Sequence, residues 1–353
     1  MIAFYLPQYH PIPENNEWWG PGFTEWINVA RGRPMFRGHY QPRIPADLGF
    51  YDLRLPETRL AQAELAGSHG IEAFCYWHYW FGGRRILERP FTEVLLSKEP
   101  NFPFCLGWAN ETWTGVWHGL PDKVLIEQTY PGPEDYTAHF LTALRAFTDP
   151  RYLTVDGKPL FYVYRPLQLP DSRRFSDLWR ELALKVGLKG LYLVGEGRQG
   201  WNPHTAGFDA LVNTGLFGLT VWQPWFHPRS RLLWEWKRLR ARPTIYRYEE
   251  ICESFIDARV GPTPHVTSHV PLLPGWDNTP RSGVNGLVLQ GSTPDLFRRQ
   301  VRRAFGVGAG APLEHRLVFL KSWNEWAEGN YMEPDLRYGR RYLEVLRDEV
   351  GTS

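Results

Sequence analysis

The sequence predicts an α/β protein whose chain forms a single (β/α)₈ barrel of the TIM type, with long loops after the strands. Short apolar runs alternate with amphipathic stretches along the chain, which indicates parallel strands joined by helices. Eight such runs are found, the number that closes this barrel. The longest polar and aromatic segments follow the runs, and in a barrel that edge carries the active site. A doubly wound open sheet is the alternative, because alternation alone does not show closure.

The eight predicted strands are short and apolar, and most end at Pro, Gly or a cluster of polar residues. The first ends at Pro7, and the last leads into a polar segment rich in Glu and Trp. The predicted strands span Ile2–Leu6, Ile71–Trp80, Phe102–Asn110, Leu160–Tyr164, Leu191–Gly195, Asp209–Asn213, Val266–Val270 and Leu317–Lys321.

Seven helices are predicted between and after these strands from apolar residues that recur at helical spacing. The clearest is Ser172–Val186, where Phe175, Leu178 and Trp179 begin one apolar stripe. Pro294 in the first turn, after Thr293, marks the start of another. The predicted helices span Pro56–Ala66, Phe91–Ser97, Asp135–Phe147, Ser172–Val186, Tyr246–Ala258, Pro294–Phe305 and Leu336–Glu349.

The chain has 353 residues, more than the roughly 250 that a barrel needs, so the surplus lies in loops. The segment 7–53 is rich in Pro, Gly and Trp and has no clear periodicity, and loops of that length are usually functional. Because the sequence shows no linker and no internal repeat, we expect one catalytic domain over 1–353.

Composition excludes some functions. Lys plus Arg is 40 against 38 for Asp plus Glu, so no strong field favours nucleic acid, and no such partner is expected. The 17 Trp indicate either a thick core or flat apolar walls for sugar rings. Cys75, Cys105 and Cys252 have no metal-binding spacing. We therefore predict neither a metal site nor a cofactor.

The N-terminal residues, MIAFYLP, lack the basic region and cleavage site of a secretory signal. No stretch approaches the eighteen apolar residues that a transmembrane helix needs. We expect a cytoplasmic location by default and no transmembrane segment. A chain trimmed at its start would look the same, so a secreted or periplasmic location stays open.

The segment 220–243 is irregular and basic, with four Trp among six Arg and Lys. One interpretation is weak contact with an anionic glycan or a membrane surface. The other is an ordinary solvated helix around Arg231–Arg240.

The segment after the last predicted strand carries the strongest chemical signal. Glu325 and Glu328 lie three residues apart, beside Trp323 and Trp326, and Glu333 follows. Acid/base chemistry on a sugar needs two carboxyl groups, one kept protonated by apolar surroundings and one kept ionised. The alternative is a polar loop whose acids face water.

If the sheet closes, the ends of the strands bring further acids, amides and aromatic residues to the same edge. Asn, Asp, Glu and His side chains bind sugar hydroxyls, and Trp covers the apolar face of the ring. Each of these residues has a structural alternative, as a packed strand end or the start of a turn. The predicted substrate-binding residues are Gln8, His10, His78, Tyr79, Trp108, Asn110, Glu111, Tyr164, Glu196, Trp276, Asp277, Asn278, Trp323 and Asn324.

A nucleotide site is less well supported. Gly195, Gly197 and Gly200 form G-x-G-x-x-G after a predicted strand. The third Gly is followed by Trp201, Asn and Pro instead of the apolar helix that would direct its N-terminus at a pyrophosphate. The sequence also lacks the Asp-x-Asp pair common in sugar-nucleotide transferases.

Six motifs, in order from Ile2 to about Tyr342, resemble the WbsX-like family, whose members are often described as glycosyltransferases of polysaccharide gene clusters and are similar to glycoside hydrolase family 99. The motifs are long and specific. They are AFYLPQYHPIPENNEWWGPGFTEW, HYQPRIPADLGFYD, FCYWHYWFGG, FCLGWANETWT, PGWDNTPR and SWNEWAEG.

The resemblance implies a (β/α)₈ barrel in which Glu325 and Glu328 match the catalytic acids of family 99. It implies retention of anomeric configuration through a 1,2-anhydro sugar. Glu325 would be the base toward the 2-hydroxyl, and Glu328 the acid toward the leaving oxygen. This chemistry needs a 2-hydroxyl anti to the leaving group, as in an α-mannoside.

One departure bears on sugar specificity. Family members commonly continue WANENWTRRWDG, whereas this chain has Gly115, Val116 and His118 in place of two basic residues and an acid.

From the resemblance we expect a retaining glycoside hydrolase acting on a bacterial polysaccharide or oligosaccharide. A glycosyltransferase of surface polysaccharide (lipopolysaccharide) biosynthesis is the first alternative, and a glycan-binding protein without catalysis is the second.

Overall fold

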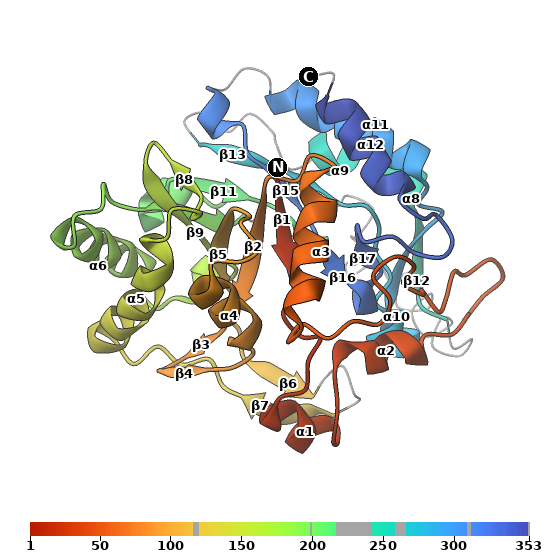
Figure 1. The fold of residues 1–353 in the computed structure, drawn as a ribbon, viewed down its shortest axis with the longest axis horizontal. Coiled ribbons are helices and arrows are strands. Elements are labelled where there is room, and N and C mark those ends of the chain that lie inside the picture. Colours follow the sequence, from red (N-terminus) through yellow and green to blue (C-terminus); the bar gives the residue numbers. More distant parts are fainter. Residues whose placement is uncertain (116–119, 198–199, 217–241, 258–265, 309–311, 352–353) are drawn as a thin grey trace, which may run out of the picture.

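The computed structural model describes residues 1–115, 120–197, 200–216, 242–257, 266–308 and 312–351. Eight parallel strands close into a barrel, which confirms the predicted fold class (Figure 1). Each strand pairs with the next, β10 pairs with β9, and the last pairs with the first. In chain order they are β1 Ile2–Tyr5, β2 Ala73–His78, β5 Phe104–Trp108, β9 Lys158–Val163, β10 Tyr192–Glu196, β11 Ala210–Val212, β13 Ser268–Leu272 and β15 Val318–Leu320.

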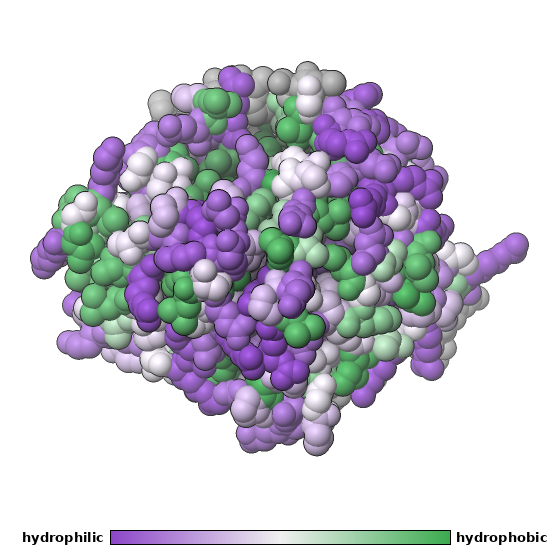
Figure 2. All heavy atoms as spheres, viewed as in Figure 1, coloured by the Kyte–Doolittle hydropathy of each residue, from purple (hydrophilic) through white to green (hydrophobic). Residues whose placement is uncertain are grey.

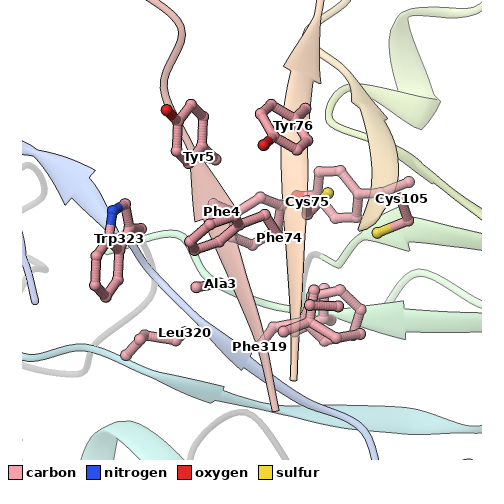
Figure 3. Close-up of a cluster of buried hydrophobic side chains, with 14 of the residues drawn as sticks. Ala3, Phe4, Tyr5, Phe74, Cys75, Tyr76, Cys105, Phe319, Leu320 and Trp323 are labelled. Carbon is pink, nitrogen blue, oxygen red and sulfur yellow. The ribbon is translucent and has the colours of Figure 1, made fainter. Parts of the chain in front are cut away.

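The interior of the barrel is filled by aromatic rings. The ring of Phe4 on β1 lies 4.9 Å from that of Tyr162 on β9, although these strands are not neighbours, so the two rings meet inside the barrel. Phe4 also stacks on Trp77 and lies 5.8 Å from Phe319. Figure 3 shows Phe4 and Phe319 among the buried side chains of this core. The core explains part of the high aromatic content.

Alternate residues of the strands face the surrounding helices, as the pleat requires. The hydroxyl of Tyr5 donates to Gln62 at 2.6 Å, and the ring of Tyr76 packs against Phe91. Trp179 is fully buried against the barrel and donates to the carbonyl of Tyr136. The outer helices are α3 Pro56–Gly67, α4 Arg89–Ser97, α5 Pro133–Phe147, α6 Ser172–Lys185, α11 Pro294–Gly308 and α12 Arg341–Val350.

Two predicted helices differ from the structure. The stretch predicted as a helix over Tyr246–Ala258 starts inside β12 Thr244–Arg247, which pairs in parallel with β14 Leu287–Gln290. Within the described residues 246–257, only α8 Tyr248–Ile251 and α9 Ser254–Asp257 are helical, and Ala258 lies outside the described residues. A partner forty residues away in the chain decides that strand, and local periodicity carries no information about it.

The last helix begins at Arg341, not at the predicted Leu336. The carboxylate of Asp335 accepts hydrogen bonds from the backbone N–H groups of Arg337 at 3.0 Å and Tyr338 at 2.6 Å, which holds a turn. Gly339 follows with φ +55°, a conformation that interrupts helix formation.

Additional short elements surround the carboxyl ends of the strands. Figure 1 shows α1, β3, β4, β6 and β7 at the lower end of the barrel, opposite the two termini. The elements after the strands include α1 Pro13–Trp19, α2 Glu25–Arg31, β3 Trp80–Phe81, β4 Arg84–Arg85, β6 Trp113–Gly115, β7 Leu120–Ile126, η3 Pro203–Ala206, α10 Thr279–Ser282, β16 Asn324–Glu325, η7 Trp326–Glu328 and β17 Asn330–Tyr331.

On the face drawn in Figure 2, hydrophobic residues form small groups among hydrophilic ones. Among the described residues, every helix is too short or too polar to cross a bilayer. The basic segment predicted over 220–243 lies, as far as residue 241, outside the described residues, so its role stays a prediction.

Candidate active site

Glu325 and Glu328 are held by a tight hairpin that follows the last barrel strand. β16 and β17 pair through Glu325 and Asn330, and η7 forms the turn between them. The hydroxyl of Ser322 accepts from the N–H of Glu325 and donates to the carbonyl of Asn330. Gly329 closes the turn at φ +59°, where a Cβ atom would lie 2.8 Å from the Cβ of Asp277. Only glycine fits here without displacing a neighbour.

One arginine joins the two glutamates. Nη2 of Arg281 donates to Oε1 of Glu325 at 2.7 Å, and Nη1 donates to Oε1 of Glu328 at 2.9 Å. The three side chains are 11–14% exposed. The fork of a guanidinium fixes the relative positions of the carboxylates that it binds, so both acids converge on one point.

A third carboxylate completes the cluster. Oε2 of Glu25, on α2, lies 2.8 Å from Nη2 of Arg281. The pKa of Glu325 is raised to about 8, mainly by burial and also by the charges of Glu328 and Glu25, whereas Arg281 opposes the rise. α2, α10 and η7 pack against one another, which brings together residues from three distant parts of the chain. We call Glu25, Arg281, Glu325 and Glu328 the acid cluster.

Asp277 lies next to the acid cluster and holds the hairpin that carries Glu325 and Glu328 in place. Nδ1 of His39 accepts from the N–H of Met35, so Nε2 donates to Oδ2 of Asp277, at 2.7 Å. Gln41 and Thr279 donate to the same carboxylate. Burial alone would raise the pKa of Asp277, but these hydrogen bonds and the charge of nearby Arg43 bring it below its usual value. The N–H of Asp277 donates to the carbonyl of Glu328 at 2.6 Å, so Asp277 positions the hairpin.

Aromatic residues lie on another side of the cluster. Burial raises the pKa of the Tyr79 hydroxyl, and the charges of Glu325 and Glu25 act in the same direction. Gln8 donates to this hydroxyl in a long hydrogen bond of 3.4 Å. The ring of Trp113 meets Tyr79 edge to face at 5.1 Å and packs on Trp18. Trp18 and Trp113 are partly exposed and offer a flat apolar surface.

Glu196 lies at the mouth of the barrel interior. Its carboxylate accepts from the hydroxyl of Tyr162 at 2.6 Å, from the N–H and hydroxyl of Thr214, and from the N–H of Gly215. Burial raises the pKa of Tyr164, with further increases from the charges of Glu111, Glu196 and Glu328. Tyr164 therefore lies within electrostatic reach of the acid cluster and of Glu196.

Glu111 forms an ion pair with Arg165 at 2.8 Å, and Arg165 covers the ring of Tyr164. The ammonium of Lys321 lies 4.9 Å from the centre of the Trp276 ring, which is almost buried. The side chain of Asn278 accepts from the N–H of Leu287, so it holds the loop after β13.

Several of the predicted substrate-binding residues are buried and lie apart from the acid cluster. The indoles of Trp108 and Trp323 are fully buried, so they do not form walls of a cleft. His78 bonds to His139 on α5, outside the barrel. His10, Asn110 and Asn324 are buried too, and the amides of the last two bind backbone groups and tyrosine hydroxyls. These positions do not support contact with a sugar at the acid cluster, because the side chains are covered or face elsewhere.

Glu333, the third acid of the hairpin segment, points into a separate buried network. It accepts from the indole N–H of Trp326 at 2.6 Å, from Gln62 at 2.6 Å and from the hydroxyl of Tyr51 at 2.9 Å. Burial raises the pKa of Glu333 to about 7, although the three donors oppose the rise. Its role in the described structure is to join α3 to the hairpin.

Replacement of Glu333 by Gln is expected to change the pH dependence of stability. The pKa of Glu333 is higher in the folded than in the unfolded chain, so the wild type loses stability as pH rises from about 4.5 to 7. At 1.36 kcal/mol per pKa unit, this contribution is about 3 kcal/mol. Urea unfolding should show that the free energy of unfolding of the wild type, minus that of the variant, falls by that amount over this pH range. For Glu64→Gln, which changes an exposed side chain, the same difference should not depend on pH.

Arg281 and Glu25 were not among the predicted site residues. Both lie in motifs that carry the resemblance, PGWDNTPR and GFTEW, but neither stands next to another charge in the sequence. Among the residues that the structure describes, no three His, Cys, Asp or Glu side chains are arranged to bind a metal ion.

Comparisons with known proteins agree with the fold. The model of the family described as "Glycosyltransferase WbsX" matches residues 1–346. Two curated relatives, both named "Uncharacterized protein WxcX", come from two strains of Xanthomonas campestris pv. campestris. Each is 40% identical over an alignment 354 residues long, which covers 99% of this chain and 49% of the relative. The chain therefore spans about half their length.

Among solved structures, the GH99 endo-alpha-mannosidase from Bacteroides thetaiotaomicron superposes with a TM-score of 0.61 and 15% identity, over 99% of this chain and 96% of that one. A "Glycoside hydrolase-like protein" gives a TM-score of 0.61 and 16% identity, over 99% and 92%. At these identities the similarity shows a shared fold.

Proposed function

The chain belongs to the WbsX family, and from this premise we propose that it is a retaining glycoside hydrolase acting on α-linked, mannose-configured sugars of a bacterial polysaccharide or oligosaccharide. The observation that carries the proposal is the fork of Arg281, which joins Glu325 and Glu328 at the carboxyl end of a closed barrel. Two converging carboxyl groups at this edge are what glycoside hydrolysis requires.

In the proposed first step, the carboxylate of Glu325 takes the proton of the sugar 2-hydroxyl. O2 then attacks C1, the bond from C1 to the leaving oxygen breaks, and the carboxyl group of Glu328 gives that oxygen its proton. The result is a 1,2-anhydro sugar, and both glutamates have exchanged protonation states. Arg281 contributes by holding the two carboxyl groups within reach of neighbouring atoms of one sugar ring.

In the second step, the carboxylate of Glu328 takes a proton from water, whose oxygen attacks C1. The bond between C1 and O2 breaks, and O2 recovers its proton from Glu325. Two inversions at C1 give net retention. The partly exposed rings of Trp18 and Trp113 are suited to stack on an adjacent sugar.

The pH profile of kcat/KM tests the role of Glu325. A base must be ionised to act, and burial raises the pKa of Glu325 to about 8. In the wild type the profile also depends on Glu328, which must be protonated, so the test uses Glu328→Gln with a substrate whose leaving group needs no protonation. We expect kcat/KM of this variant to rise about tenfold per pH unit below a midpoint somewhat under 8, because the charge of Glu328 no longer raises the pKa of Glu325. If Glu325 instead delivered the proton, this variant would lack its base, kcat/KM would show no such rise, and the two roles would have to be exchanged.

A glycosyltransferase is the second candidate, and the description of the matching family favours it. The two functions differ in products and in donors. Incubation with a panel of bacterial surface polysaccharides, followed by NMR of the released ends, should show new reducing ends with retained configuration. Calorimetry with sugar nucleotides and polyprenyl-linked sugars should show no saturable binding. The opposite pair of results would establish the transferase, and binding without any product would leave a glycan-binding protein.

A further inference from the structure

A cavity lies outside the barrel, between the helices α4 and α5 and the strands β2 and β5. Its volume is about 350 Å³, within the range of small-molecule sites. In Figure 1 the two helices lie next to each other on the same side of the barrel, with α4 above β3. Phe91 of α4, Leu106 of β5 and Ala143 of α5 line the cavity. The acid cluster contributes no residue to it, so this cavity is separate from the proposed active site.

The lining of this cavity is divided about evenly between apolar and polar surface, and its rim leaves apolar side chains in solvent. Leu96 on α4 is 60% exposed and Leu141 on α5 is 53% exposed, and both line the cavity. Exposed leucines at the edge of an open, partly apolar concavity suit a ligand that carries an aliphatic part.

Two arginines line the same cavity without ionic partners. The Nε–H group of Arg85, at the end of β4, is buried and forms no hydrogen bond. Within the described part of the chain, no carboxylate lies within ion-pair distance of Arg85 or Arg145. The charge of Glu88 acts on Arg85 only from farther away, and burial lowers the pKa of Arg85. A partly buried cation without a counter-charge favours binding of an anion.

The remaining polar groups at the floor of the cavity add no charge. His78 shares a hydrogen bond of 2.9 Å with His139. Burial lowers the pKa of His78 to about 3, so its imidazole is neutral at neutral pH. The cavity therefore combines apolar surface with positive charge that comes from arginine alone. A sugar would find few acceptors for its hydroxyls in such a lining.

We propose that the cavity between α4 and α5 binds an amphipathic anion, whose carboxylate or phosphate pairs with Arg85 and Arg145 and whose aliphatic chain lies against Phe91, Leu106 and Ala143. Arginine binds both head groups through the same fork. The ligand comes either from solution or from the surface of an anionic membrane. The site is independent of the proposed glycan chemistry.

Calorimetry with decanoate and decyl phosphate tests the proposal on the whole chain. Both anions should bind saturably with one site, and decanol and inorganic phosphate should bind at least about tenfold more weakly. Arg85→Gln should weaken binding of the anions by about tenfold or more, and Arg85→Lys by less. Arg84→Gln is the matched control, because Arg84 is exposed and paired with Glu14.

Two further measurements separate the outcomes. Glu328→Gln should bind decyl phosphate like the wild type, and Arg85→Gln should keep glycan turnover, so failure of either proposal leaves the other standing. Sedimentation with vesicles that contain anionic lipid, compared with neutral vesicles, shows whether the ligand is a membrane lipid. If it is, Arg85→Gln should abolish binding of the protein to the anionic vesicles. No saturable binding of either anion or of anionic vesicles, equal binding of decanol, or unchanged binding in folded Arg85→Gln would overturn the proposal.

Discussion

Replacement of Glu328 by Gln is expected to lower glycan turnover by about 10²–10⁴-fold, the usual contribution of a general acid and base. Gln keeps the size of the side chain, and its oxygen can still accept from Nη1 of Arg281, as the carboxylate does at 2.9 Å. It cannot give a proton to the leaving oxygen or take one from water. The fold and the binding of glycan should therefore survive. Reducing-end assays and calorimetry on the same preparation measure the two quantities.

Glu64→Gln is the control for this experiment, because Glu64 is exposed on α3, outside the barrel. Turnover within a few-fold of the wild type in Glu328→Gln would contradict its assigned role. Loss of glycan binding together with turnover would show that Glu328 binds substrate and does not act only on protons. With a substrate whose leaving group is activated, the rate of the first step should partly recover in Glu328→Gln, because such a group leaves without being protonated.

Replacement of Arg281 by Leu is expected to destabilise the fold by about 3–5 kcal/mol, the usual cost of leaving buried charge without its partner. Three carboxylates, those of Glu25, Glu325 and Glu328, would lose the cation that they share. The loss should be larger at pH 8 than at pH 5, because carboxyl groups without a cation take up protons as the pH falls. Urea unfolding at the two pH values measures both effects.

Two variants accompany this measurement. Arg281→Lys keeps the charge but loses the fork, so it should recover part of the stability and little of the activity. Arg298→Leu removes a surface arginine that pairs with Asp348 and Glu349, and it should cost at most about 1 kcal/mol. A midpoint of unfolding for Arg281→Leu equal to that of the wild type would show that the acid cluster does not depend on its arginine.

The barrel could be predicted because its signals are local. Each predicted strand overlaps an observed one, since every buried strand is a short apolar run that needs no knowledge of its neighbours. The errors occurred where distant residues decide. β12 forms because β14 lies beside it. The last helix starts late because the side chain of Asp335 binds the backbone ahead of it. The expectation of one domain over the whole chain stays a prediction.

The pair Glu325 and Glu328 could be found from spacing and from the resemblance, but their environment could not. Arg281 lies 44 positions before Glu325 in the chain, and Glu25 lies 300 positions before it. Tryptophan content was a poor guide to cleft walls, because Trp108 and Trp323 fill the core, whereas Trp18 and Trp113 remain partly open. A side chain's residue type is visible in the sequence, but its exposure depends on what packs over it.

The sequence by itself determined the alternation of strands and helices, the edge of the barrel that carries polar residues, and the two glutamates three residues apart. Only the tertiary structure decided that one guanidinium joins those glutamates and that a third acid shares it. It also decided that His78 faces a separate cavity. The physical reason is that periodicity and spacing are properties of neighbours along the chain, whereas charge pairing and burial depend on residues that meet only when the barrel closes.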